Sequence, residues 1–502
     1  MAKPKTVLII GAGIAGLAAG CYARMNGYDT RILELHNLPG GLCTAWRRGD
    51  FIFDGCLHYL FGSAPDGPYY RLWEELGAVQ GRTFVNHTEL MRVTGEQGRT
   101  LVVYCDPDRL EAHLLDLAPS DAPRLRALAD GVRAFATFDL AALQAQPRDL
   151  MGLSDWQSLG RKMSPFLGAQ LRWGRHSAAS FAATLKDPFL RRAAPHMFGW
   201  PEMPLTAGLS LLASMHAGNA GFPVGASLAF AQAIERRYLE LGGEVLYGSR
   251  VERILVNDDR AVGAQLYSGE VYHADHVVSA ADGRTTHFGL LAGQYLDRHL
   301  KRRYDGHLPL RPQVQVSFGV ARDLTNEPHW MTYLPADPLT LGGVRHHAVG
   351  VKHYAFDASL APPGKTPVIV SLLADYEYWR RIYGHRLYDE RQADLADALL
   401  GWLEPRYPGL GAQVEVLDVA TPISYEYFTG NWQGSTCGWL LTLGTMVALI
   451  RGLRQTVPGL RNFVMAGQWV QPGGSVPVAA MSGRNAVKLL CQLDRRPFVA
   501  AP

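Results

Sequence analysis

The stretch from Val7 to Glu34 constrains the fold more than any other part of the chain. A short apolar run rich in β-branched residues is followed at once by Gly11, Gly13 and Gly16, in the spacing G-x-G-x-x-G. Helix-forming small and apolar residues come next, then a second apolar run that ends at Glu34. This acid stands close to the ~20 residues beyond the glycines that dinucleotide-binding βαβ units require. The order predicts a parallel α/β sheet that binds a dinucleotide.

Each part of this unit has a physical task. Gly11 permits the tight turn, Gly13 lets the backbone approach a pyrophosphate, and Gly16 lets the helix pack on the sheet. The free N–H groups at the start of the helix favour phosphate oxygens. Glu34 can accept hydrogen bonds from ribose hydroxyls and would repel a 2′-phosphate.

Composition narrows the class of protein further. The 502 residues are 47% hydrophobic and 19% charged, and the net charge of +3 is too small to indicate nucleic-acid binding. Six scattered cysteines form no C-x-x-C pair and indicate neither zinc nor a disulfide framework. No segment of about 20 uncharged apolar residues appears, and the N-terminus does not read as a signal peptide. We expect a cytoplasmic protein, either free or peripheral on the inner face of the membrane.

Two further motifs follow the acid. Gly40-Gly41-Leu42 places bare backbone shortly after Glu34, and the segment 54–62 reads as a strand, a turn and a second strand. With these motifs the chain resembles the phytoene-desaturase-like branch of the flavin amine oxidase superfamily, which contains carotenoid desaturases, carotenoid isomerases and retinol saturase. The resemblance implies FAD as cofactor, with the second glycine pair along it and the segment 54–62 beside the flavin.

The resemblance extends to the middle and the end of the chain. The residue at Val251 would meet the adenine through its backbone, and the strand, loop and helix over 462–490 would hold the flavin end of FAD. Where relatives often carry an acid after the strand, this chain has Gln468. The cofactor-binding residues implied are Gly11, Gly13, Ile14, Ala15, Gly16, Glu34, Leu35, Gly40, Gly41, Leu42, Val251, Gly467, Gln468, Gly474, Val476 and Pro477.

The predicted fold is therefore α/β, with a discontinuous Rossmann-like FAD-binding domain of the glutathione-reductase type 2, amine-oxidase-like kind. We assign residues 1–70, 222–300 and 455–502 to it, and residues 71–221 and 301–454 to an inserted α+β substrate-binding domain with a helical part. Amphipathic periodicity predicts helices over 109–117, 122–135 and 226–241. No second glycine fingerprint for NAD(P) follows.

One helical stretch interleaves bulky apolar and basic residues, as in a helix lying on a bilayer. The alternative is a helix packed on its own domain with its arginines outside. The residues concerned are Trp156, Arg161, Lys162, Phe166, Leu167, Leu171, Arg172, Trp173 and Arg175.

The family's substrates imply an FAD-dependent oxidoreductase that desaturates, saturates or isomerises C–C bonds of an apolar polyene or isoprenoid. His58 and Tyr59 are the candidate catalytic groups nearest the flavin, with Glu426 a weaker candidate. Leu205 to Met215 would line a substrate tunnel or belong to ordinary core, and Trp439 would lie by the flavin or in the core. The alternatives are an amine oxidase, which favours an aromatic pair and a lysine such as Lys352 near the flavin, and a non-catalytic prenyl- or lipid-binding relative.

Overall fold

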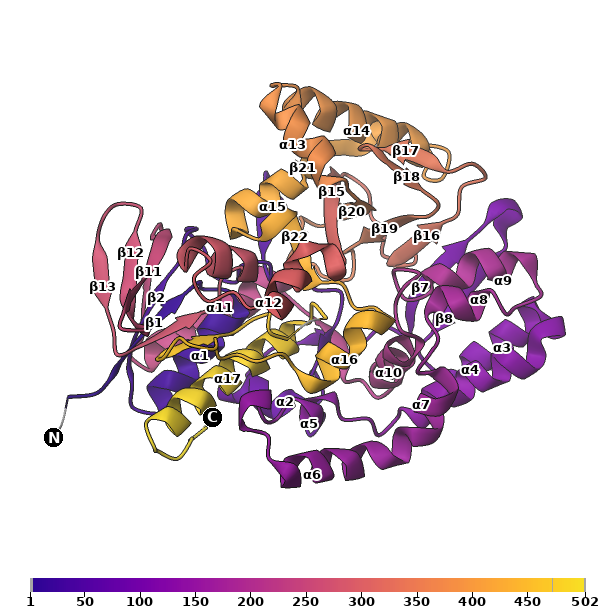
Figure 1. Cartoon of the computed structure of the whole chain (residues 1–502). Coiled ribbons are helices and arrows are strands. Elements are labelled where there is room, and N and C mark those ends of the chain that lie inside the picture. Colours follow the sequence, from indigo (N-terminus) through magenta and orange to yellow (C-terminus); the bar gives the residue numbers. More distant parts are fainter. Residues whose placement is uncertain (1–2, 472, 501–502) are drawn as a thin grey trace.

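The computed structural model describes residues 3–471 and 473–500, so Pro472 in the predicted loop 468–475 lies outside the described residues. A parallel sheet with its helices occupies one side of the molecule (Figure 1). A larger mixed sheet stands beside it under two helices, and a group of shorter helices completes the opposite and lower sides.

The parallel sheet contains five strands in the order β10-β2-β1-β14-β23, and every neighbouring pair is parallel. Its strands come from three distant stretches of the chain, which confirms the predicted α/β fold class. Their bounds are Thr6–Ile10 (β1), Asp29–Leu33 (β2), Glu244–Leu246 (β10), His276–Ser279 (β14) and Phe463–Met465 (β23).

Strand β1 is apolar on both faces because both faces are covered. Val7 and Ile9 pack with the helices α1 (Ile14–Met25), α11 (Ala226–Glu240) and α17 (Val476–Leu493). Leu8 and Ile10 pack instead with an antiparallel sheet on the other face. That sheet consists of β11 (Val251–Asn257), β12 (Arg260–Leu266) and β13 (Val271–His273). Alternate side chains of a strand point to opposite faces, so a doubly covered strand reads as one continuous apolar run.

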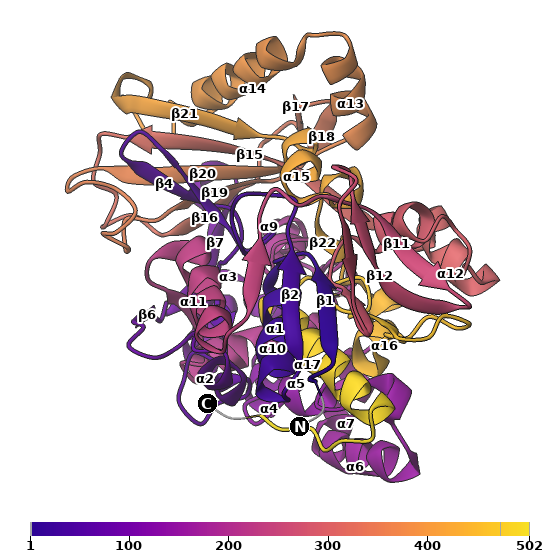
Figure 2. The same ribbon diagram turned by 90° about the vertical axis from the view of Figure 1, so that its left-hand side faces the viewer.

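The two ends of the chain meet where α1 packs against α17 (Figure 2). A Cβ atom added at Gly483 would lie 2.2 Å from the carbonyl oxygen of Ala15. A Cβ at Gly16 would lie 1.9 Å from the carbonyl oxygen of Gly11. Glycine at these positions therefore lets α17 pack against α1 and lets α1 pack against the turn that precedes it.

The mixed sheet has the strand order β21-β15-β20-β19-β16-β7-β8, and β22 pairs with β15 off this path. One face packs on α13 (Tyr376–Gly384) and α14 (Tyr388–Leu403) around the fully buried Trp379. The opposite face is turned toward the cavity described below. The strands are Glu89–Thr94 (β7), Thr100–Tyr104 (β8), Leu310–Val320 (β15), Trp330–Tyr333 (β16), Val349–His353 (β19), Thr366–Leu373 (β20), Val414–Ala420 (β21) and Ser435–Trp439 (β22).

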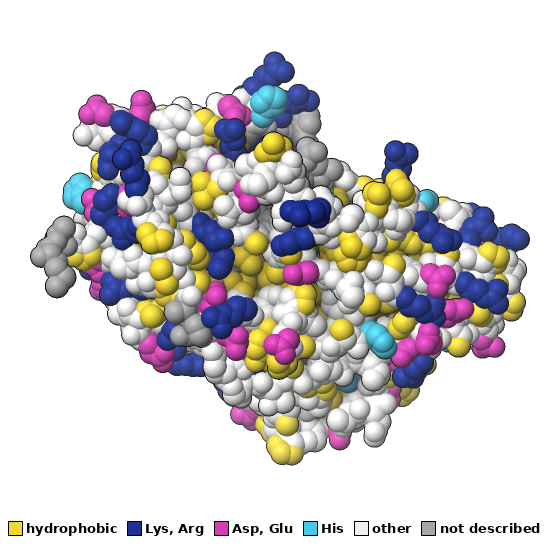
Figure 3. Space-filling view, turned by 90° about the horizontal axis from the view of Figure 1, so that it is seen from below, with side chains coloured by type: hydrophobic (Ala, Val, Ile, Leu, Met, Phe, Trp, Pro, Cys, Tyr) yellow, Lys and Arg dark blue, Asp and Glu magenta, His cyan; other side chains and the backbone are white. Residues whose placement is uncertain are grey.

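The predicted helices are confirmed as α3 (Pro107–Leu117), α4 (Ala122–Ala134) and α11. Helix α10 (Leu205–His216) belongs mainly to the core, although one side of it lines the cavity. Helices α6 (Leu153–Met163) and α7 (Leu167–Trp173) lie along the lower side, and from below hydrophobic side chains are interspersed with lysines and arginines (Figure 3). Among the described residues, none of the helices has the length and apolar character needed to cross a membrane.

Candidate flavin and substrate site

Two glycine turns form the first part of the site. Gly11 leaves β1 with a φ of +99°, a conformation that side chains rarely permit, and Gly13 follows as the N-cap of α1. The second pair lies directly on this turn: the Gly40 N–H donates to the Ala12 carbonyl at 2.9 Å, and a Cβ at Gly41 would lie 3.3 Å from the Gly13 Cα. Bare backbone from two segments thus borders the start of α1.

Helix α1 begins without a side-chain cap, because Gly13 has no side chain to accept hydrogen bonds from the first turn. The first N–H groups of the helix, from Ile14 and Ala15 onward, therefore remain available to an anion. A Cβ at Gly13 would have no atom nearer than 3.9 Å, so the space over this turn is open. An open, uncapped glycine turn fits a pyrophosphate.

Glu34 is buried at the end of β2. Its carboxylate accepts hydrogen bonds from the N–H groups of Ala12 at 2.5 Å and His36 at 2.9 Å. Burial raises the pKa of Glu34, and these N–H donors oppose the shift. The acid therefore fixes the glycine turn to the second strand, and it lies where the sequence predicts a ribose contact.

The last segment of the chain lies against the same turn. Gly467 follows β23 with a φ of +103°, and a Cβ there would lie 3.8 Å from the Ala15 Cβ. Gly474 contacts Cys437 so closely that a Cβ would lie 2.3 Å from the cysteine Cβ. Ser475 is the N-cap of α17 and makes no capping hydrogen bond, and Pro477 lies in the first turn. A second uncapped helix N-terminus thus points into the site, which suits a group that gains negative charge.

The remaining cofactor candidates lie around these turns. Val251 is buried in the cluster that contains Leu8 and Leu33, and Leu35 lies within contact of Gly430. Gln468 donates from Nε2 to Asn431 Oδ1 at 3.4 Å. Leu42 and Val476 line the cavity. These cofactor assignments remain predictions.

A cavity of about 670 Å³ begins at the N-terminus of α17 and continues over the mixed sheet. This volume is typical of a small-molecule site. Alternate residues of the strands supply its floor, while the residues between them face α14: the lining side chains are Arg311, Gln313 and Gln315 on β15, Lys352 on β19, and Ile369 and Ser371 on β20. Apolar side chains cover the opposite wall, among them Leu90, Phe135, Phe138, Leu140, Leu143 and Leu211.

Asp54, His58 and Tyr59 line the cavity. Asp54 is buried and accepts hydrogen bonds from the Ser227 N–H at 2.7 Å and hydroxyl at 2.8 Å. Burial raises the pKa of Asp54 to about 6 and that of Tyr59 to about 12. The His58 side chain is accessible, and its accessible surface forms part of the cavity wall. Burial and then the charge of Lys352 hold the pKa of His58 well below its usual value, so the imidazole is a proton acceptor near neutral pH.

Lys352 is the most unusual group of the cavity. Its Nζ is buried, lies 3.3 Å from the centroid of the Trp330 ring, and has no hydrogen-bond partner among the described residues. Burial holds its pKa well below the usual value, with Asp54 opposing the shift. The Trp330 ring also contacts His58, with 5.4 Å between centroids. Lys352 is the lysine that the amine-oxidase alternative would place near the flavin, and it lines the cavity, whereas Trp439 lies in the core.

Three residues singled out from the sequence lie outside the cavity lining. Glu426 on α15 (Pro422–Thr429) accepts a hydrogen bond from the Tyr376 hydroxyl at 2.6 Å, so it holds two surface elements together. Trp439 is fully buried in a cluster with Tyr304 and Trp469 and is ordinary core. Trp173 is also buried, with only 7% of its surface exposed, so this side chain fits the alternative of packing on its own domain.

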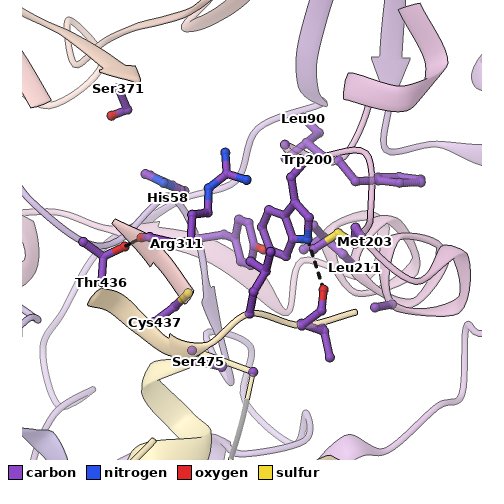
Figure 4. A pocket seen from close by; sticks show the side chains of 18 of the residues that line it. His58, Leu90, Trp200, Met203, Leu211, Arg311, Ser371, Thr436, Cys437 and Ser475 are labelled. Carbon is purple, nitrogen blue, oxygen red and sulfur yellow. Dashed lines mark hydrogen bonds between the residues drawn. The ribbon is translucent and has the colours of Figure 1, made fainter. Parts of the chain in front are cut away.

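Sequence reasoning missed Arg311 and Trp200. Figure 4 shows the Arg311 side chain between His58 and Trp200, reaching into the cavity. Trp200 is held by a hydrogen bond from its Nε1 to the Leu441 carbonyl at 3.1 Å. A usable signal existed in β15, where Arg311, Gln313 and Gln315 alternate with apolar residues. Polar residues at every second position of a strand predict a face that is not packed in the core.

The parallel sheet, the two uncapped helices and the glycine turns define a dinucleotide-binding protein. A family model described as flavin containing amine oxidoreductase matches residues 14–491, and the chain belongs to this family. This membership and the fit of the glycine turns confirm an FAD-dependent oxidoreductase.

Similar proteins agree with this family. A phytoene desaturase (lycopene-forming) of Pseudescherichia vulneris is 26% identical, over 97% of this chain and 99% of the relative. A chloroplastic prolycopene isomerase of an Oncidium hybrid is 23% identical, over 96% of this chain and 83% of the relative. Among solved structures, an oxidoreductase from Methanosarcina mazei has a TM-score of 0.61 at 16% identity, covering 96% of this chain and all of that one. Cyclohexylamine oxidase from Brevibacterium oxydans has a TM-score of 0.57 at 16% identity, covering 98% of this chain and all of that one.

Proposed function

We propose that this protein is an FAD-dependent oxidoreductase that desaturates, saturates or isomerises C–C bonds of a polyene or isoprenoid chain. The observation that carries the proposal is the cavity, which joins the N-terminus of α17 to a long apolar wall. Two relatives, a phytoene desaturase and a prolycopene isomerase, support the same substrate class.

The residues have separate tasks in this proposal. The bound flavin supplies hydride transfer at its ring. The uncapped start of α17 stabilises negative charge beside it. The apolar wall orients an extended chain and excludes water, and His58 is placed to accept a proton from a chain lying along the cavity.

Oxidation of amines is the alternative that the sequence left open. The groups Arg311 and Lys352 line the same cavity, and the arginine keeps its positive charge. A protonated amine would be repelled by this wall. Trp439 also cannot supply one member of an aromatic pair in this cavity, because it lies in the core.

Anaerobic spectroscopy of the flavin-loaded protein tests the proposal. We expect a polyene to bleach the oxidised flavin, or to restore the colour of the photoreduced flavin, without oxygen. Neutral isoprenoid alcohols and hydrocarbons serve as the substrate panel, and primary amines serve as the comparison. Bleaching by amines alone, with release of hydrogen peroxide in air, would contradict the proposal.

We also propose contact between helices α6 and α7 and a bilayer surface. The exposed fractions of Leu153, Leu167 and Leu171 are 76%, 57% and 76%. Basic residues accompany them on the same stretch, as on helices that lie in a membrane interface. Met163 and Gln170, from the same two helices, line the cavity, so an apolar substrate would enter beside the docked surface.

A further inference from the structure

One guanidinium in the cavity has no partner to neutralise it. Arg311 lies near the start of β15, and its carbonyl accepts a hydrogen bond from the Thr436 hydroxyl at 3.2 Å, which fixes the backbone. Its guanidinium carbon lies 5.5 Å from the centroid of the Trp200 ring. Among the described residues, the guanidinium makes no hydrogen bond and has no carboxylate oxygen within 4.0 Å. Five N–H donors are therefore directed into the cavity unused.

The surroundings do not supply the missing negative charge. Burial lowers the pKa of Arg311, and Cys437 and Glu202 oppose the shift. Glu202 lines the same cavity, but among the described residues it forms no ion pair with Arg311. The neighbouring His196 has its pKa lowered to about 4 by burial, by His347 and by Arg311 itself. An arginine remains charged despite such a shift. Charge without a partner in a largely enclosed cavity is costly unless a ligand neutralises it.

The rest of the cavity defines what such a ligand must look like. The wall opposite the polar strand faces is built from Leu90, Phe135, Phe138, Leu140 and Leu143. A ligand that satisfies both regions has an extended apolar body and a single acidic end. The single positive charge of this guanidinium, beside neutral histidines, is neutralised by one carboxylate. The two carboxylate oxygens can accept two parallel hydrogen bonds from the guanidinium. A diphosphate carries more charge than this single cation would neutralise.

We propose that the substrate is a polyene or isoprenoid acid and that Arg311 determines specificity by binding its carboxylate. The inference rests on the proposed function and narrows it, since a pure hydrocarbon would leave the guanidinium unpaired. Trp200 has a positioning task, because its ring holds the guanidinium side chain and its own N–H is fixed to the Leu441 carbonyl. Figure 4 shows the Arg311 and Trp200 side chains next to each other among the residues that line the cavity.

Equilibrium dialysis with a matched pair of probes tests the inference. The probes are cis-parinaric acid, a conjugated polyene acid, and its methyl ester, which keeps the body and removes the charge. We expect the flavin-loaded protein to bind the acid about ten- to a hundredfold more tightly than the ester, as for hydrogen bonds to charged groups. Arg311→Met should weaken binding of the acid to the level of the ester, and Arg311→Lys should retain part of the preference.

Arg47→Met removes an exposed arginine of β3 (Ala45–Arg48), away from the cavity, and should leave both affinities unchanged. Equal binding of acid and ester by the unaltered protein would overturn the inference, and so would a preference that survives in Arg311→Met. Loss of flavin from Arg311→Met, measured by absorbance after gel filtration, would assign the arginine to the cofactor instead. Failure of both probes to bind would count against the polyene function itself, which separates the two proposals.

Discussion

Gly13 and Gly16 stand three residues apart, but the structure gives them different tasks. A Cβ at Gly16 would collide with the Gly11 carbonyl, whereas a Cβ at Gly13 would enter open space next to Gly40. Gly13 also has φ −65° and ψ 171°, which any residue can adopt. Gly16 therefore serves folding, while Gly13 is needed only when a cofactor occupies the turn.

We expect Gly13→Val to abolish FAD binding without unfolding the protein, because the side chain fills the space meant for the pyrophosphate. Gly16→Val should instead lower stability by several kcal/mol, since overpacking against a backbone carbonyl cannot relax easily. Flavin absorbance of the purified variants and their thermal unfolding check both results. Normal flavin content in Gly13→Val would contradict the proposed cradle.

Lys352 gives a prediction about stability at a single residue. Its amine has a depressed pKa when folded, so between the folded and the unfolded pKa the unfolded chain holds a proton that the folded protein does not. Lys352→Met should raise the free energy of unfolding by about 1–3 kcal/mol at pH 7, because it removes a buried polar group without a partner. The gain should shrink as the pH approaches the ordinary lysine pKa of about 10.4. Denaturant unfolding at several pH values measures it, and a loss of stability at pH 7 would show that the contact with Trp330 dominates.

At the scale of elements, the junction between β7 and β16 contains a stacked pair of histidines. The ring centroids of His87 and His329 lie 3.7 Å apart, and the Nε2 of His87 has no hydrogen-bond partner among the described residues. Burial, with smaller effects of His353 and Lys352, lowers the pKa of His87 to about 4. Burial, followed by the charge of His87, lowers that of His329 to about 2. Both rings are therefore neutral in the folded protein at neutral pH.

Because these pKa values are depressed in the folded state, the stability linked to them is present above the unfolded value of about 6.5 and is lost as the pH falls toward 4. His87→Phe should reduce the loss of stability over this interval by about 1–3 kcal/mol, since the aromatic contact remains and the titration disappears. Chemical denaturation at pH 7, 5.5 and 4 measures the change. His299→Phe, at an exposed position of α12 (Arg298–Arg302), is the control; equal pH profiles for all three proteins would refute the assignment.

At the scale of the whole molecule, the sequence predicted the structure best where a short motif is compatible with a single local fold. The run from Val7 to Glu34 predicted the strand, the turn, the helix and the second strand, because periodicity and glycine spacing act over short distances. The family resemblance then placed the end of the chain beside the start. The parallel sheet in which β1 and β23 take part agrees with that expectation.

The substrate cavity was harder to predict, because it is built from side chains that are distant in sequence. Arg311 on β15, Lys352 on β19 and Trp200 in the loop before α10 line one cavity only after the chain has folded. Trp439 and Trp173 illustrate the opposite case: the sequence singled them out as candidates for the site or for a surface, but both are packed in the core. Spacing along the chain cannot distinguish a residue that packs from one that lines a cavity when both lie on the same kind of element.

Helices α6 and α7 lead to a prediction for the molecule as a whole, because they carry exposed leucines and also border the cavity. We expect the protein to float with anionic liposomes and the double variant Leu167→Asp, Leu171→Asp to float at least tenfold less, since each change removes buried apolar area and adds a repelled charge. Leu239→Asp with Leu417→Asp is the matched control, because these leucines are 46% and 45% exposed but lie on other elements. Flotation that falls equally in both double variants, or that is missing from the unaltered protein, would contradict the proposed contact between these helices and a bilayer. Selective loss would mean that the cavity opens beside the bilayer, so an apolar substrate could reach it without crossing water.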